Sequence, residues 1–203
     1  PPYRRTVTPG VTVNWNLPNI LTLTRVLCIP LLVGVFYFAG PFSGPAAAVI
    51  FVLAAITDWL DGWLARLLKQ ESEFGAFLDP VADKLIVATA LVLLVDHYDS
   101  IWLTLAAIVI IGREILVSAL REWMARRGQS QSVAVTLMGK LKTTLQMIAI
   151  ILLLWRMGEP FSDQLLQSGL ASLAAAVVLT LWSMWNYLGA MLSSPDTRDD
   201  ERA

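Results

Sequence analysis

The chain has 203 residues, of which 56% are hydrophobic and only 15% are charged. Its mean hydropathy of +0.63 is typical of an integral membrane protein and excludes an ordinary water-soluble domain. The formal net charge of -1, together with the lack of any dense basic stretch, excludes nucleic acid as a partner.

Six apolar segments follow one another along the chain, each close to the roughly 20 residues that cross a hydrocarbon core. We predict helices over residues 17–39, 46–68, 79–95, 101–127, 133–155 and 165–192. Residues 1–16 are predicted to be a surface or disordered segment, and the acidic tail 193–203 is predicted to be disordered. The sequence therefore indicates an all-α membrane protein with one six-helix domain over residues 17–192.

The first predicted helix carries Thr22 and Arg25 three residues apart, so both lie on one face. Arg25 is placed to approach acidic groups elsewhere in the bundle or a lipid phosphate. The alternative is an arginine that extends along the helix end to reach the membrane surface.

Four aspartates interrupt the apolar sequence where the second helix ends and the third begins. They are Asp58, Asp61, Asp79 and Asp83. Asp58 and Asp61 are separated by about one helical turn and share a helical face, and so do Asp79 and Asp83. The small residues Gly62, Ala65 and Gly75 leave room for a ligand beside these carboxylates. The two short acidic faces can therefore lie opposite each other, because only a short connection joins the two helices.

A lone aspartate at the centre of a membrane helix costs roughly 2.5 to 3.5 kcal/mol, so these carboxylates need nearby positive charge. Four oxygen ligands without cysteine or histidine favour hard cations such as Mg²⁺ or Mn²⁺, and a pair of such ions can drive phosphoryl chemistry. Structural ion pairs are the alternative, but the nearby cations Arg66, Lys69 and Lys84 are too few. Cys28 and His97, each the only one of its kind, support no cysteine or histidine mechanism.

Further cations lie in the fourth and fifth helices. Arg113 and Glu114 are adjacent and diverge by 100° around the helix, so we predict that they do not satisfy each other. Arg113 is then expected to meet an anion across the bundle, either a carboxylate of the third helix or a substrate phosphate. Lys140 and Lys142 point to different sides, so one is expected to serve the site and the other to meet lipid headgroups.

Basic residues flank the connections after the second and fourth helices, whereas the other three connections offer only Arg156. By the positive-inside rule, both termini and the acidic residues face the cytoplasm.

The acidic stretch resembles the signature of the CDP-alcohol phosphotransferase family, and this resemblance covers about residues 16–191. The matching pattern is Asp58-x2-Asp61-Gly62-x2-Ala65-Arg66-x8-Gly75-x3-Asp79-x3-Asp83. The resemblance implies that the first three aspartates hold a metal pair, and that Asp83 is both a metal ligand and the general base. It also implies that Gly62, Ala65 and Arg66, with Gly75 beside them, lie against the CDP group, and that the protein is a homodimer.

The surrounding segments most resemble bacterial family members that transfer a phosphatidyl group from CDP-diacylglycerol to sn-glycerol 3-phosphate and release CMP. An acceptor with its own phosphate needs cations beyond the metals, and the candidates are Arg113, Lys140 and Lys142, with Thr22, Arg25 and Arg121 as further possibilities. Chemistry alone leaves inositol phosphate, serine or phosphatidylglycerol open as acceptors. An ion-coupled transporter would require inverted repeats and broken helices, which the sequence does not show, and a purely structural protein leaves the carboxylates unexplained.

Overall fold

The structure is a computed structural model that describes residues 17–68, 73–126, 137–157 and 163–192. Within these ranges the side chains at 17–19, 65–66, 68, 73–74, 76, 121, 124–126, 137–140 and 186–192 are not described. The predicted terminal segments, 1–16 and 193–203, lie outside the described residues. The elements are α1 (Leu17–Phe38), the short 3-10 helix η1 (Gly40–Phe42), α2 (Ser43–Leu68), α3 (Glu73–Tyr98), α4 (Ile101–Arg126), α5 (Leu137–Arg156) and α6 (Asp163–Leu192).

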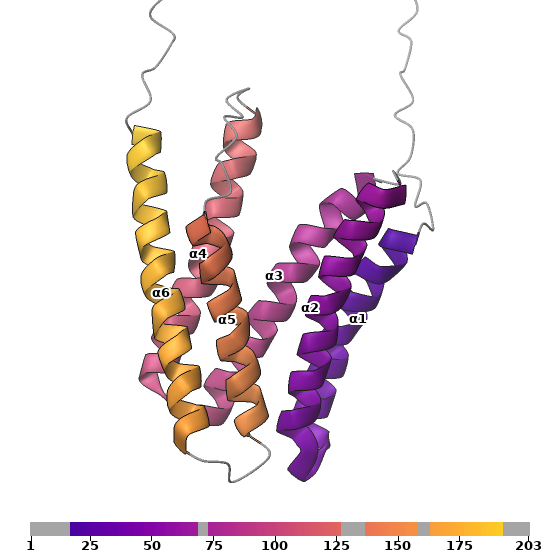
Figure 1. Cartoon of the computed structure of the whole chain (residues 1–203), viewed down its shortest axis with the longest axis vertical. Helices are drawn as coiled ribbons and strands as arrows, with labels where there is room; N and C mark the ends of the chain where they lie inside the picture. Colours follow the sequence, from indigo (N-terminus) through magenta and orange to yellow (C-terminus); the bar gives the residue numbers. More distant parts are fainter. Residues whose placement is uncertain (1–16, 69–72, 127–136, 158–162, 193–203) are drawn as a thin grey trace, which may run out of the picture.

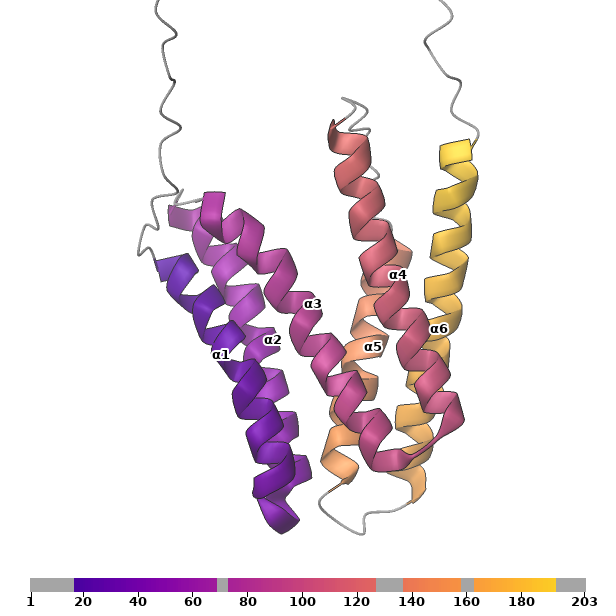
Figure 2. The ribbon, with the colours of Figure 1, turned by 180° about the vertical axis from the view of Figure 1, so that it is seen from behind.

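The helices run alternately up and down, and α1 begins at the same end of the bundle at which α6 ends (Figure 1). Helix α1 packs against α2 and α3, whereas α5 packs most extensively against α6 and also meets α2. Helix α4 contacts α3 and α6, so α3 links the two halves of the bundle (Figure 2). The ends of α2 and α4 and the starts of α3 and α5 therefore lie at one end of the molecule.

Four helices in the described residues are long and apolar enough to cross a membrane: α1, α2, α4 and α6. Large apolar side chains also cover the outer surface of the bundle; Trp59 is 67% exposed and Trp102 is 77% exposed. Such an extensive apolar surface is suited to lipid rather than to water. Helices α3 and α5 are not among these four. Helix α3 carries the second half of the acidic signature, and α5 carries Lys140 and Lys142.

Helix α3 begins at Glu73, six residues before the predicted start at Asp79, so Pro80 lies inside the helix. That prediction was wrong because proline was taken as a first-turn residue. Pro80 lacks only the N–H that would bond to the carbonyl oxygen of Ala76, and a helix can continue through one such loss. Gly75, Asp79 and Asp83 consequently follow one another on one helical face at four-residue spacing.

The connections at the other end of the bundle are shorter than expected. The predicted turn at residues 40–45 is a single 3-10 turn that begins at Gly40 with φ +58°, and α2 already starts at Ser43. Between α3 and α4 only Asp99 and Ser100 remain outside helices, and Asp99 adopts φ +43°. A left-handed residue lets the chain reverse at once, and aspartate is one of the side chains that tolerates it.

Small side chains let the helices approach closely in the core. Among the described residues, seven alanines are at most 1% exposed: Ala47, Ala48, Ala54, Ala82, Ala90, Ala149 and Ala176. Gly169 of α6 leaves no room even for a methyl group, because a Cβ atom built there would lie 2.9 Å from Cδ2 of Leu153 on α5. Leu153 is itself fully buried, so it has little space into which to move. Close contact between α5 and α6 therefore requires glycine at this position.

Replacing Gly169 by alanine should lower the thermal unfolding temperature of the detergent-solubilised protein. Overpacking costs about 1–3 kcal/mol, whereas the gain in helix propensity is about 1 kcal/mol. Gly112→Ala is the matched control, because a Cβ at Gly112 meets nothing within 4 Å, and it should unfold no earlier than the wild type. Equal unfolding temperatures for the two variants would show that α5 and α6 are less tightly packed than the structure indicates.

Candidate active site

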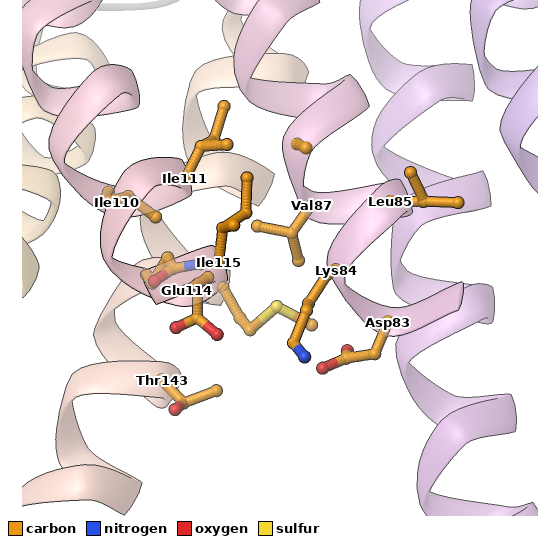
Figure 3. A pocket seen from close by; sticks show the side chains of 12 residues that line it. Asp83, Lys84, Leu85, Val87, Ile110, Ile111, Glu114, Ile115 and Thr143 are labelled. Carbon is orange, nitrogen blue, oxygen red and sulfur yellow. The ribbon is translucent and has the colours of Figure 1, made fainter. Parts of the chain in front are cut away.

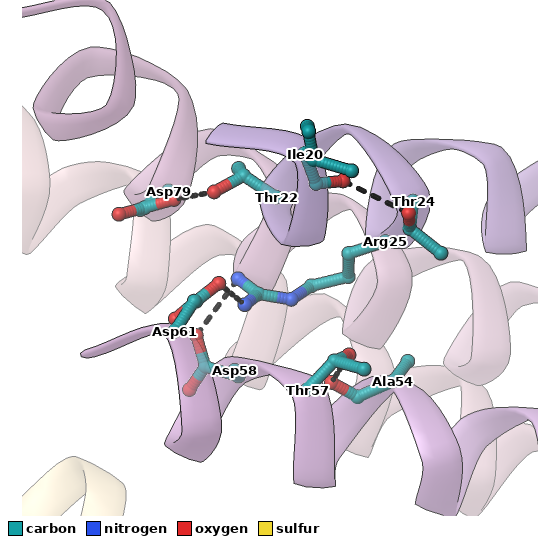
Figure 4. A network of polar contacts seen from close by, with 9 residues as sticks. All are labelled: Ile20, Thr22, Thr24, Arg25, Ala54, Thr57, Asp58, Asp61 and Asp79. Atoms are coloured by element: carbon teal, nitrogen blue, oxygen red, sulfur yellow. Dashed lines mark hydrogen bonds and ion pairs between the residues drawn. The ribbon is translucent and has the colours of Figure 1, made fainter. Parts of the chain in front are cut away.

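A buried arginine joins α1 to the acidic end of α2. The guanidinium of Arg25 is only 1% exposed; its Nη1 lies 2.8 Å from Oδ1 of Asp58, and its Nη2 donates to Oδ2 of Asp61 (Figure 4). Asp61 is 3% exposed, whereas the side chain of Asp58 is 47% exposed. A buried charge is tolerated only when it is paired, so these three side chains depend on one another. The prediction that Arg25 approaches the acidic residues is confirmed.

Thr22 extends the same face of α1 by one turn and connects it to α3. Its hydroxyl donates a hydrogen bond to the Asp79 carboxylate (Figure 4). One face of α1 therefore contacts acids on two other helices, two of them through Arg25 and one through Thr22. We call Thr22, Arg25, Asp58, Asp61 and Asp79 the acidic network.

A cavity of about 170 Å³ begins one helical turn along α3 from this network. Asp83 lies about 6 Å along the helix axis from Asp79 and lines the cavity. The other polar residues in its wall are Lys84, Glu114, Thr143 and Gln146, from α3, α4 and α5 (Figure 3). Isoleucine, valine and methionine side chains form most of the remaining wall, so the polar groups lie in a mainly apolar surface.

Behind one wall of the cavity, a single carboxylate oxygen holds two cations. Oε1 of Glu114 lies 3.2 Å from Nη1 of Arg113 and 2.9 Å from Nζ of Lys142, and Lys142 is 3% exposed. Nη2 of Arg113 also donates to Oγ of Ser183 on α6, at 3.3 Å. Two positive charges and one negative charge therefore meet where α4, α5 and α6 pack together. We call these four residues the cation cluster.

The prediction that Arg113 and Glu114 do not satisfy each other is wrong. Their Cα–Cβ bonds diverge by about 100°, but both side chains are long enough to curl around the helix until their ends meet. Arg113 consequently finds its carboxylate on its own helix rather than across the bundle. In this cluster the contact between α4 and α5 is made by Glu114, which accepts a hydrogen bond from Lys142 of α5.

The acidic network suits a hard divalent cation in its chemistry, because it offers only oxygen ligands and holds positive charge between two carboxylates. In the described residues, however, no three or more acidic, histidine or cysteine side chains are arranged to hold a metal ion. The guanidinium of Arg25 contacts both Asp58 and Asp61 (Figure 4). Metal ligation by the four aspartates stays a prediction.

The remaining predicted site residues are placed only by their helices. Gly62 is half-buried on α2 next to Asp61, and Gly75 is buried on α3 one turn before Asp79. Four others lie in α2, α4 and α5, but their side chains are outside the described part of the structure: Ala65, Arg66, Arg121 and Lys140. Their proposed contacts with CDP or with the acceptor phosphate are therefore untested.

Sequence reasoning missed Ser183 and Gln146 as site residues. Gln146 follows Lys142 by one helical turn and is a polar residue at the edge of a long apolar run, which was a usable signal. Ser183 carried a weaker signal, because small hydroxyl residues are common in membrane helices without binding anything. Only the packing of α6 against α4 shows that it reaches Arg113.

The fold and these two sites define a helical integral membrane protein with an acidic centre and a separate cavity beside it, behind one wall of which two cations share a carboxylate. The chain matches the family model described as CDP-alcohol phosphatidyltransferase over residues 15–182, a range that includes the whole acidic network and the cavity. The chain belongs to the CDP-alcohol phosphatidyltransferase family, as the signature predicted. Enzymes of this family generally depend on a divalent metal ion.

Several relatives carry one name, CDP-diacylglycerol–glycerol-3-phosphate 3-phosphatidyltransferase. The chain is 54% identical to the protein from Sodalis glossinidius over 175 residues, which cover 86% of this chain and 94% of the relative. It is also 54% identical over 176 residues to the protein from Escherichia coli K12, and 53% identical over 176 residues to the one from Salmonella choleraesuis. In both cases the match covers 87% of this chain and 94% of the relative.

Proposed function

We propose that this protein transfers the phosphatidyl group of CDP-diacylglycerol to sn-glycerol 3-phosphate, releasing CMP and forming phosphatidylglycerophosphate. It would thus be a phosphatidylglycerophosphate synthase in anionic phospholipid biosynthesis. The observation that carries the proposal is the cavity, which has Asp83 beside the acidic network in one wall and Glu114, the partner of two buried cations, in another. The near full-length similarity to relatives named for this reaction supports the same donor and acceptor.

The acidic network is proposed to take the CDP end of the donor. Asp58, Asp61, Asp79 and Asp83 would hold Mg²⁺ or Mn²⁺, which when bound supplies positive charge to the pyrophosphate and to the departing CMP. Gly62 and Gly75 leave room beside the carboxylates, and Ala65 and Arg66 follow on the same helix as Gly62. Arg25 fixes the positions of two of the acids from α1.

The cavity is proposed to take the acceptor. Asp83 accepts the proton of the attacking hydroxyl as the new bond from oxygen to phosphorus forms and the bond from phosphorus to the CMP oxygen breaks. Lys142 and Arg113, together with Lys140, are proposed to attract the acceptor's own phosphate, because they gather positive charge behind one wall of the cavity. Serine carries no phosphate and has less need of this positive charge, which favours a phosphorylated acceptor.

We further propose six spans in the bacterial cytoplasmic membrane, with the termini and the active site on the cytoplasmic side, and a homodimer as the assembly. The excess of lysine and arginine in the connections at the acidic end of the bundle supports this orientation.

The direct test uses the purified protein in detergent with CDP-diacylglycerol, Mg²⁺ or Mn²⁺, and a panel of radiolabelled alcohols. We expect CMP release and labelled lipid with sn-glycerol 3-phosphate. Lack of CMP release with every alcohol would reject a phosphatidyltransferase. Product with serine or inositol phosphate, but none with sn-glycerol 3-phosphate, would reject the proposed acceptor while keeping the reaction class.

A further inference from the structure

Gln146 has a buried polar atom that nothing in the described structure satisfies. The residue lies on α5 one turn after Lys142, is only 4% exposed and lines the cavity. Its side-chain oxygen Oε1 has no hydrogen-bond partner among the described residues. More than nine in ten buried polar groups in proteins are paired, so an unpaired one needs an explanation.

Leaving a buried acceptor unpaired costs about 1–3 kcal/mol. An apolar side chain of similar size, such as methionine, would fill the same space without this penalty. A glutamine at this position is therefore explained if a bound molecule brings a donor to Oε1. The cavity can accommodate such a molecule, since its volume of about 170 Å³ exceeds that of several water molecules.

The other polar groups in the cavity wall are already engaged or are assigned to other parts of the reaction. Glu114 uses Oε1 for two cations, Thr143 already has an interaction of its own, and Lys84 can only donate. Asp83 is the proposed base for the attacking hydroxyl. Gln146 is thus a buried acceptor in the cavity wall that lacks a partner among the described residues.

We propose that Gln146 recognises the hydroxyl of the acceptor that does not react, so that it selects a vicinal diol phosphate over a simple hydroxyalkyl phosphate. This inference rests on the proposed function. Glycerol 3-phosphate presents three groups in order: the attacking hydroxyl, a middle hydroxyl and a phosphate. Asp83 of α3 lines the cavity and is assigned to the first group, and Lys142 of α5, which lies behind the cavity wall beside Glu114, is assigned to the last. Gln146, one turn from Lys142 and in the same wall, takes the middle hydroxyl as its donor.

The substrate that tests this assignment is 3-hydroxypropyl phosphate, which keeps the phosphate and the attacking hydroxyl but lacks the middle one. A site built to bond a substrate hydroxyl rejects the analogue without it, because the buried partner is left unpaired. We expect the wild-type kcat/KM to be about 10- to 100-fold lower for 3-hydroxypropyl phosphate than for glycerol 3-phosphate.

Gln146→Met should lower kcat/KM for glycerol 3-phosphate by about 10- to 100-fold and change that for 3-hydroxypropyl phosphate by less than about twofold, so that the preference disappears. Gln167→Met is the control, since Gln167 is exposed on α6 near the opposite end of the bundle and should leave both values unchanged. Thermal unfolding of both variants shows whether either has lost its fold.

Equal losses on both acceptors would make Gln146 a structural residue and overturn the assignment. A wild-type enzyme that uses the two acceptors equally well would overturn it too, and this measurement needs no variant. Failure of the proposed function looks different, because the wild type would then form no product from glycerol 3-phosphate at all.

Discussion

Asp61→Asn is expected to abolish phosphatidyl transfer, lowering kcat by at least about 1000-fold. Asp61 is the most deeply buried carboxylate of the acidic network and carries a charge that Arg25 and the proposed metal ions both require. Asparagine has nearly the same shape, so the loss isolates the charge rather than the packing. Isothermal titration with Mn²⁺ should show weaker metal binding in the same variant, which gives a measurement independent of turnover.

Asp96→Asn supplies the matched control for this substitution. Asp96 lies on α3 at the far end of the bundle, where it is exposed and accepts a hydrogen bond from Tyr37 at 2.9 Å. Its loss should leave both turnover and Mn²⁺ binding close to the wild-type values. If Asp61→Asn behaved like this control, the acidic network would not be the catalytic centre.

The sequence was sufficient to predict what depends on short-range spacing. Helical periodicity placed Thr22 and Arg25 on one face of α1 and Asp58 and Asp61 on one face of α2, and the structure joins these faces. The order of the helices was also predictable, because each apolar run is as long as a membrane crossing and is bounded by polar or glycine-containing turns.

Features that depend on the reach of side-chain ends, or on packing between distant helices, were not predictable. The angle between Arg113 and Glu114 around the helix was read correctly, but the ends of both side chains bend back to meet. The early start of α3 escaped detection because proline is common in the first turn of a helix, whereas Pro80 lies inside α3. The unpaired oxygen of Gln146 could not be predicted, because it depends on which side chains of other helices pack around the cavity.

Arg25→Met should strongly destabilise the metal-free protein. The guanidinium is 1% exposed and lies against two carboxylates, so its removal leaves the buried charge of Asp61 without its partner. Breaking a buried ion pair from one side costs about 3–5 kcal/mol, which should appear as a clear fall in the thermal unfolding temperature in detergent with a chelator present. Arg25→Lys keeps a positive charge but cannot form a forked contact with two acids. Its unfolding temperature should therefore lie between those of Arg25→Met and the wild type.

Adding Mn²⁺ distinguishes two roles for this arginine. If Arg25 supplies the positive charge that the carboxylates need when no metal is bound, Mn²⁺ should restore more stability to Arg25→Met than it adds to the wild type, because the ion then satisfies otherwise unpaired acids. If Arg25 only anchors α1 to α2, Mn²⁺ should stabilise both proteins equally. Unfolding of Arg25→Met at the wild-type temperature would contradict both roles, since the burial of this arginine would then be explained by neither charge balance nor helix contact.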